Sequence, residues 1–145
     1  MVGFRTWPGR GTVRRVLIAG VVAAAGLCAG VVAAQGPALA MLDRLQPGLW
    51  ELRERGGDGA VRRLCVESGR KLIQIRHPGE SCRNLVIEDA AGAVTVQYSC
   101  PGTGYGRTRI RFESPGLAQV ETQGIARGLP FDFSAEARRT GNCGG

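Results

Sequence analysis

Four cysteines, Cys65, Cys82, Cys100 and Cys143, constrain the fold of this chain more than any other feature of the sequence. All four follow an apolar N-terminal segment that is typical of an export signal, and a fifth cysteine, Cys28, lies inside that segment. An exported chain reaches an oxidising compartment, where an even set of thiols forms disulfides. We therefore expect two disulfides in a small domain that resides in the periplasm or cell envelope of a bacterium.

The N-terminal segment has the three zones of a signal peptide. Residues 1–15 hold four arginines and no acid, residues 16–34 are an unbroken apolar run, and Ala38-Leu39-Ala40 offers small residues for a cleavage site. A second candidate cut follows Ala34. The alternative is an uncleaved anchor, because an apolar run of about 18 residues can span a bilayer, although alanine and glycine dominate this run. We expect residues 1–40 to be the signal peptide and residues 41–145 to be a single domain.

The basic character of the chain is partly a property of this signal. The formal net charge of the whole chain is +7, and removal of residues 1–40 leaves 15 basic against 12 acidic residues, a net charge of +3. Every basic residue except Lys71 is an arginine. Such a balance does not predict a nucleic-acid partner, and none is expected outside the cytoplasm.

Period-two alternation marks most of residues 41–145 as β-strand. The clearest case is residues 107–113, in which Thr108, Ile110 and Phe112 share one face and charged residues share the other. Further strands are expected at residues 49–55, 60–66, 83–88, 94–100, 117–123 and 129–138, with one short helix between residues 67 and 75. The fold class is therefore mainly β: an antiparallel curled sheet or half-barrel of about seven strands, with a small sandwich as the alternative.

Two hairpins have registers that can be predicted. If Ser114 faces Ala118 across the turn at residues 114–117, then Phe112 faces Val120 and Arg111 faces Glu121, so that apolar residues pair and opposite charges meet.

In the hairpin centred on Ala91, the apolar pattern matches Leu85 with Val96 and Ile87 with Val94.

The hairpin centred on Ala91 also bears on the disulfides, because four cysteines allow three pairings. Cys82 and Cys100 flank it symmetrically, which predicts the disulfides Cys82–Cys100 and Cys65–Cys143. The apolar register puts Cys82 opposite Ser99, one residue away, so a bulge or a loose strand end is required. A zinc site is the alternative, but the cysteine spacings of 17, 18 and 43 residues include no close pair. We expect no metal and no cofactor.

Several short motifs carry a resemblance to a known family. They are Gln46-Pro47-Gly48-Leu49-Trp50-Glu51, Leu64-Cys65-Val66, Cys82, Val94-Thr95-Val96 leading into Cys100-Pro101-Gly102, and Arg138-Arg139-Thr140-Gly141-Asn142-Cys143. In this order they resemble the secreted bacterial family called domain of unknown function 3617, over nearly all of residues 41–145. The chain departs from that family in having little methionine. The resemblance implies an envelope or periplasmic β-domain with two disulfides, and it implies no catalytic residue.

Few residues are candidates for catalysis. His77 is the single histidine of the sequence, so nucleophilic catalysis or a histidine metal site would have to use it. Its position beside Pro78-Gly79 favours a solvated loop histidine. The acid pairs Glu51 with Glu54 and Glu88 with Asp89 have the residue types of a hydrolase, but exposed acids are ordinary on a strand face and beside a turn. We expect no catalytic residue.

Three further features have a binding and a structural interpretation. Arg107, Arg109 and Arg111 form a basic ridge that could contact anionic lipid headgroups or glycans, or simply a solvated strand face partly neutralised by Glu121. The glycine-rich run at residues 101–106 is interpreted as a flexible turn, because a strand follows it where a phosphate loop needs a helix. Trp50 is interpreted as a core anchor or as the wall of an apolar cavity.

The expected function is therefore that of an exported, non-enzymatic binding or structural domain. A curled sheet covered by one helix can hold a small molecule in its concave face, so the candidate partners are an envelope lipid, a glycan or a small apolar ligand. Contact with the membrane is expected only through the N-terminal segment, if that segment is not cleaved. The alternative is a small envelope hydrolase, which would require Glu51, Glu54 or His77 to meet in one cleft.

Overall fold

A computed structural model describes residues 38–56 and 58–144 of the chain. The predicted signal peptide lies outside these residues, except for its last three positions. No helix within the described ranges is long and apolar enough to cross a membrane.

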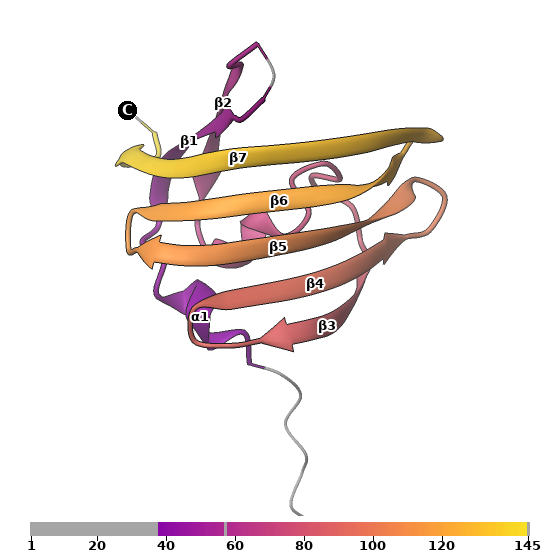
Figure 1. Ribbon diagram of the computed structural model, residues 1–145, viewed down its shortest axis with the longest axis horizontal. Coiled ribbons are helices and arrows are strands. Elements are labelled where there is room, and N and C mark those ends of the chain that lie inside the picture. Colours follow the sequence, from indigo (N-terminus) through magenta and orange to yellow (C-terminus); the bar gives the residue numbers. More distant parts are fainter. Residues whose placement is uncertain (1–37, 57, 145) are drawn as a thin grey trace, which may run out of the picture. The chain divides into compact units, whose positions relative to one another are not determined.

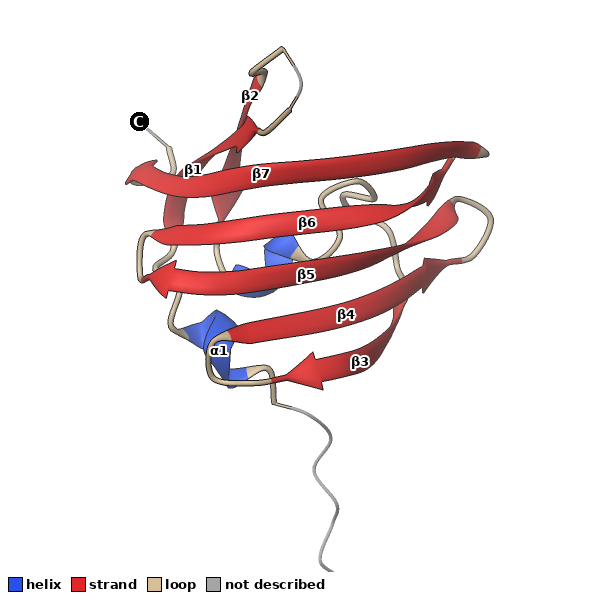
Figure 2. Ribbon diagram, viewed as in Figure 1, coloured by secondary structure: helices blue, strands red, loops and turns tan. Residues whose placement is uncertain are grey.

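The described residues form one unclosed antiparallel sheet of seven strands (Figures 1 and 2). The order across the sheet is β2-β1-β7-β6-β5-β4-β3. In chain order the strands are β1 (Gly48–Glu54), β2 (Val61–Val66), β3 (Arg83–Asp89), β4 (Ala93–Cys100), β5 (Gly104–Ser114), β6 (Leu117–Ala126) and β7 (Leu129–Gly141). The predicted mainly β fold class is thus confirmed.

Two short helical segments accompany the sheet. The 3-10 helix η1 (Gly69–Leu72) falls in the predicted helical region, and Ser68 caps it by accepting a hydrogen bond from the backbone of Arg70. The four-residue helix α1 (Ala40–Asp43) was not predicted. Asp43 of α1 pairs with Arg70 of η1, and this hydrogen bond holds the pKa of the Asp43 carboxyl below its ordinary value. The pair joins the two helices to each other.

The strand order decides where the core lies. Strands β2 and β3 are consecutive in the chain but form opposite edges of the sheet, so residues 67–82 must cross one face of it. We call this face the inner face. In Figure 1 the crossing segment runs behind β5 and β6. Leu72, Ile73 and Ile75 of this segment are buried.

The inner face is filled by apolar side chains from the central strands. Trp50, Leu52, Val94, Val96, Ile110 and Val120 are fully buried there, together with Met41, Leu42 and Leu45 from α1 and its vicinity. The Trp50 indole donates a hydrogen bond to the Gln46 carbonyl at 3.0 Å. Trp50 is therefore a core anchor, which was one of its two predicted roles.

The register between β5 and β6 differs from the prediction. Phe112 faces Ala118 and Arg109 faces Glu121, whereas the sequence placed Val120 opposite Phe112 and Glu121 opposite Arg111. The predicted register was wrong by two residues, because Pro115 and Gly116 alone form the turn and the strand is irregular at Glu113.

The pairing of β3 with β4 contains one bulge, whereas the stretch next to the disulfide is regular and needs none. Val86 faces Val96 and Glu88 faces Thr95, so Ile87 is the extra residue. The predicted matches of Leu85 with Val96 and of Ile87 with Val94 were wrong. Both side chains lie on the exposed face of this edge strand, where Leu85 is 60% and Ile87 48% exposed.

Candidate functional site

The two predicted disulfides are both present. Cys65 is bonded to Cys143, with 5.5 Å between their Cα atoms, and Cys82 is bonded to Cys100, with 4.2 Å between theirs. Cys82 precedes Arg83, which faces Ser99, so the register places Cys82 directly opposite Cys100. Two disulfides are typical of an oxidising, extracytoplasmic environment.

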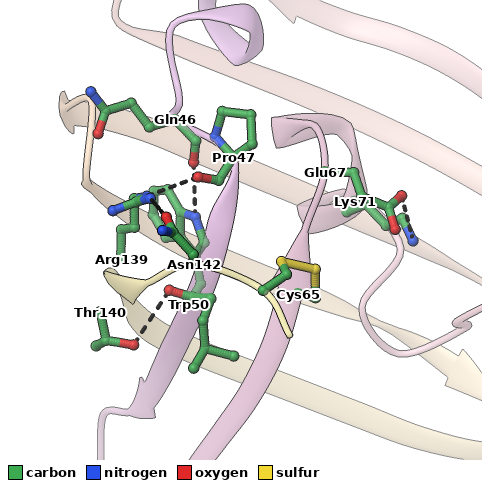
Figure 3. The surroundings of a disulfide bond; sticks show 11 residues. Gln46, Pro47, Trp50, Cys65, Glu67, Lys71, Arg139, Thr140 and Asn142 are labelled. Atoms are coloured by element: carbon green, nitrogen blue, oxygen red, sulfur yellow. Dashed lines mark hydrogen bonds and ion pairs between the residues drawn. A yellow bond between two sulfur atoms is a disulfide. The ribbon is translucent and has the colours of Figure 1, made fainter. Parts of the chain in front are cut away.

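The Cys65–Cys143 disulfide ties the end of the chain to β2 (Figure 3). Around it, Arg139 donates hydrogen bonds to the Pro47 carbonyl at 2.8 Å and to Asn142 at 2.7 Å, and Thr140 donates to the Leu49 carbonyl at 3.3 Å. The C-terminal strand is therefore fixed by polar contacts as well as by the covalent bond.

The face of the sheet opposite the core, here called the outer face, carries two rows of polar side chains. The first row runs across four strands and consists of Gln97, Arg107, Gln123 and Asp132, which are register partners from β4 to β7. All four are exposed. Among the described residues none of these side chains has a hydrogen-bond or ion-pair partner, and we therefore call this set the open row.

The second row is adjacent, and several of its side chains are paired. It consists of Thr95, Arg109, Glu121 and Ser134, again register partners from β4 to β7. Glu88 of β3 extends it, because its carboxylate accepts a hydrogen bond from Thr95 at 2.8 Å and pairs with Arg109 at 3.5 Å. We call these residues the paired row.

The two rows line adjoining hollows in the outer face. One hollow, of about 470 Å³, takes residues from both rows and from five strands. The other, of about 380 Å³, is lined by the open row together with Tyr105, Gly106, Gly124 and Phe131. The hollows share Arg107, Gln123 and Asp132, so they form one continuous polar groove, and both volumes lie in the range of small-molecule sites, about 300–1,000 Å³.

The arginine ridge predicted from the sequence lies partly in this groove. Arg107, Arg109 and Arg111 all project from the outer face, as their alternation with Thr108, Ile110 and Phe112 indicated. Arg107 and Arg109 line the larger hollow and Arg111 does not. Sequence reasoning missed the rest of the groove, since Gln97, Gln123 and Asp132 become neighbours of Arg107 only through the strand register.

His77 occupies a buried position rather than a solvated loop. It is 4% exposed, its Nδ1 lies 3.1 Å from the Tyr98 hydroxyl, and the two rings meet edge to face. Its Nε2 is buried without a partner among the described residues. The prediction of a solvated histidine was wrong because residues 67–82 cross the inner face, which carries His77 under the sheet.

Tyr98 is the centre of a polar chain beneath the sheet. Burial raises the pKa of the Tyr98 phenol, while a hydrogen bond from Thr122 and the charge of Arg76 act in the opposite direction. Thr122 also lies 2.7 Å from Thr108, which donates to the carbonyl of Ile73 at 2.5 Å. The chain of hydroxyls therefore fixes the crossing segment against β4, β5 and β6.

The acids considered for hydrolysis are dispersed. Glu51 accepts a hydrogen bond from Arg63 at 2.9 Å on the outer face, whereas His77 packs on the inner face. Glu88 belongs to the paired row, and the Asp89 carboxylate accepts from the backbone of Leu39 at 3.2 Å. Within the described residues there is also no group of three His, Cys, Asp or Glu side chains that could hold a metal ion.

The fold and the disulfides define a disulfide-stapled β-domain with a single open sheet and a polar groove on its uncovered face. In comparisons with known proteins, no family model, no curated protein and no solved structure matches the chain. The resemblance to domain of unknown function 3617 stays a prediction that these comparisons do not test.

Proposed function

We propose that this protein is an exported, non-enzymatic domain that binds a small polar ligand in the outer-face groove. The observation that carries the proposal is the open row, four neighbouring polar side chains that line a hollow and have no partner in the described part of the chain. A few polar groups that converge on one hollow are typical of ligand sites.

The groove is favoured over the interior as the site. The inner face was the expected place for an apolar ligand, but Trp50, Leu52, Val96 and Ile110 are fully buried against the chain's own helices and crossing segment. An interior that is already filled by the protein's own side chains leaves no space for a ligand. The hollows described above belong to the outer face.

The two disulfides support a location outside the cytoplasm, and the N-terminal sequence pattern supports export. We propose the bacterial periplasm or cell envelope as this location. The predicted family resemblance is consistent with it. A ligand in the groove would then come from the envelope.

The proposal is tested by ligand capture. The full chain, with its disulfides formed, is incubated with an aqueous small-molecule extract of bacterial envelopes, dialysed, and examined by mass spectrometry. A compound retained by the wild-type protein should be lost from a variant with Arg107→Ala and Asp132→Ala. Arg111→Ala is the matched control, because Arg111 lies on the same strand and face but outside the hollows, and it should retain the compound.

Two results would contradict the proposal. One is that no compound is retained by the wild-type protein; the other is that the double variant retains it as well as the control does. The alternative function of an envelope hydrolase has no observation in its favour here, since Glu51 and His77 lie on opposite faces of the sheet.

A further inference from the structure

We propose that the ligand of the groove is a neutral oligosaccharide, bound by the open row and stacked on Tyr105. This inference rests on the proposed function and adds the chemical class of the ligand.

The charge of the groove does not favour an ionic ligand. The larger hollow is lined by two guanidinium groups, from Arg107 and Arg109, and by three carboxylates, from Glu88, Glu121 and Asp132. Arg55 approaches Glu121 at 4.0 Å from beside the hollow, so the positive and negative charges balance. An anionic headgroup or phosphate would meet these carboxylates at close range, and a cation would meet the guanidinium groups.

The open row instead offers both hydrogen-bond donors and hydrogen-bond acceptors. Arg107 supplies only donors, Asp132 only acceptors, and the amides of Gln97 and Gln123 supply both. Facing residues on antiparallel strands have Cβ atoms about 4.5–5.5 Å apart, so the row presents these groups at short, regular intervals. Hydroxyl groups both donate and accept, and a chain of sugar rings repeats them at regular intervals, which matches this pattern.

Tyr105 supplies the apolar part of such a site. It lies on the outer face of β5, two residues before Arg107, and is 52% exposed. Its register partners are Ser99 on β4 and Ile125 on β6, and Tyr105 lines the smaller hollow beside the open row. One face of a sugar ring carries mainly C–H groups, which pack against an aromatic ring while the hydroxyl groups at its edge remain free for the open row.

The experiment is a titration of the full chain, with disulfides formed and in buffer free of sugars and glycoside detergents. The neutral probes are maltotriose, cellotriose and N,N′,N″-triacetylchitotriose; the anionic probes are trigalacturonate and inorganic phosphate. Binding is measured by isothermal titration calorimetry. We expect at least one neutral trisaccharide to bind and both anionic probes to bind more weakly or not at all.

Variants test the assigned contacts. Tyr105→Ala should weaken binding by roughly tenfold or more, whereas Tyr105→Phe, which keeps the ring, should bind almost normally. Asp132→Asn should weaken binding by roughly tenfold, since hydrogen bonds to charged groups are the stronger ones. Arg111→Ala, outside the hollows, should have no effect.

The outcomes separate the ligand class from the proposed function. Tighter binding of trigalacturonate or phosphate would overturn the neutral-sugar assignment and leave the groove as a binding site. If no probe binds, but a non-sugar compound is captured from the envelope extract in a groove-dependent manner, the sugar assignment is overturned and the proposed function stands. If neither titration nor capture gives a groove-dependent ligand, both are overturned.

Discussion

Replacing Tyr98 by phenylalanine tests the buried hydrogen-bond chain that the fold places under the sheet. The Tyr98 hydroxyl lies 3.1 Å from His77 Nδ1, and both residues are almost completely buried. The other ring nitrogen of His77 already has no partner among the described residues. Tyr98→Phe therefore removes one hydrogen bond and leaves the imidazole with neither nitrogen satisfied.

The expected cost follows from these two terms. A hydrogen bond contributes about 1 kcal/mol and an orphaned buried polar group costs about 1–3 kcal/mol, so we expect a loss of about 2 kcal/mol in the free energy of unfolding. With a urea m-value near 2 kcal/mol/M, the midpoint falls by about 1 M. The measurement is urea unfolding of the oxidised protein, followed by the fluorescence of buried Trp50 and by circular dichroism.

A double-mutant cycle isolates the contact. His77→Leu should also destabilise, because it leaves the Tyr98 hydroxyl without its imidazole partner. The double variant should be more stable than the sum of the single effects predicts, by about 1 kcal/mol or more, since neither group is then orphaned. Tyr105→Phe is the matched control: this hydroxyl is on an exposed residue, and its loss should change stability by less than about 0.5 kcal/mol. Additive effects in the cycle, or equal effects of the two Tyr→Phe changes, would refute the reasoning.

The same hydroxyl predicts a pH dependence. Burial raises the pKa of Tyr98 in the folded state, so above the ordinary tyrosine pKa of about 10 the unfolded chain releases this proton before the folded one does. The folded state then binds more protons than the unfolded state, and stability falls as pH rises from about 10 toward the folded-state pKa. Unfolding curves between pH 9 and pH 11 should show this fall in the wild-type protein. It should be smaller in Tyr98→Phe, and an unchanged fall would contradict the assignment.

Three further predictions concern the ends and edges of the domain. The Cys65–Cys143 disulfide should be reduced before the Cys82–Cys100 disulfide, because Cys143 is exposed whereas Cys100 is only 2% exposed. Alkylation and peptide mapping at increasing reductant concentration measure the order of reduction, and simultaneous reduction of both disulfides would contradict the prediction. The mature protein should begin at Gln35 rather than Met41, since Leu39 is only 8% exposed and its backbone is bonded to Asp89, and N-terminal sequencing of the exported protein would show which cut is used. Deletion of the bulge residue Ile87 should preserve the fold and both disulfides, whereas deletion of Gln97 from the regular strand β4 should prevent folding, because every later side chain of that strand changes face. Circular dichroism and non-reducing peptide mapping distinguish these results. If both deletion variants fail to fold, this interpretation of Ile87 is contradicted.

The strands were predictable because their faces differ in polarity. In β5 the alternation of Thr108, Ile110 and Phe112 with three arginines determines which face is buried, and the structure agrees. A shift of two residues between neighbouring strands leaves every side chain on its own face. The polarity pattern therefore could not distinguish Arg109 from Arg111 as the partner of Glu121, and the positions of the groove residues relative to one another were undetermined.

The position of His77 depends on information that is not local. Its neighbours Pro78 and Gly79 are typical of a surface turn, and nothing within several residues predicts burial. Burial follows from the strand order, which puts β2 and β3 at opposite edges and sends the segment between them across the inner face. A sequence pattern predicts individual strands, whereas their order across the sheet arises from packing between distant residues.

One extra residue in β3 links the disulfide to the groove. Between Arg83 and Val86 the strand keeps the register that places Cys82 opposite Cys100. If that register continued without a bulge, Ile87 would face Thr95, and Glu88 would face Val94 on the inner face, where a carboxylate would be buried among apolar side chains. The bulge at Ile87 instead turns Glu88 to the outer face, where it meets Thr95 and Arg109. The bulge therefore lets β3 combine the register of the disulfide with the acidic end of the paired row, and it does so in an edge strand, where a bulge also hinders pairing with another chain.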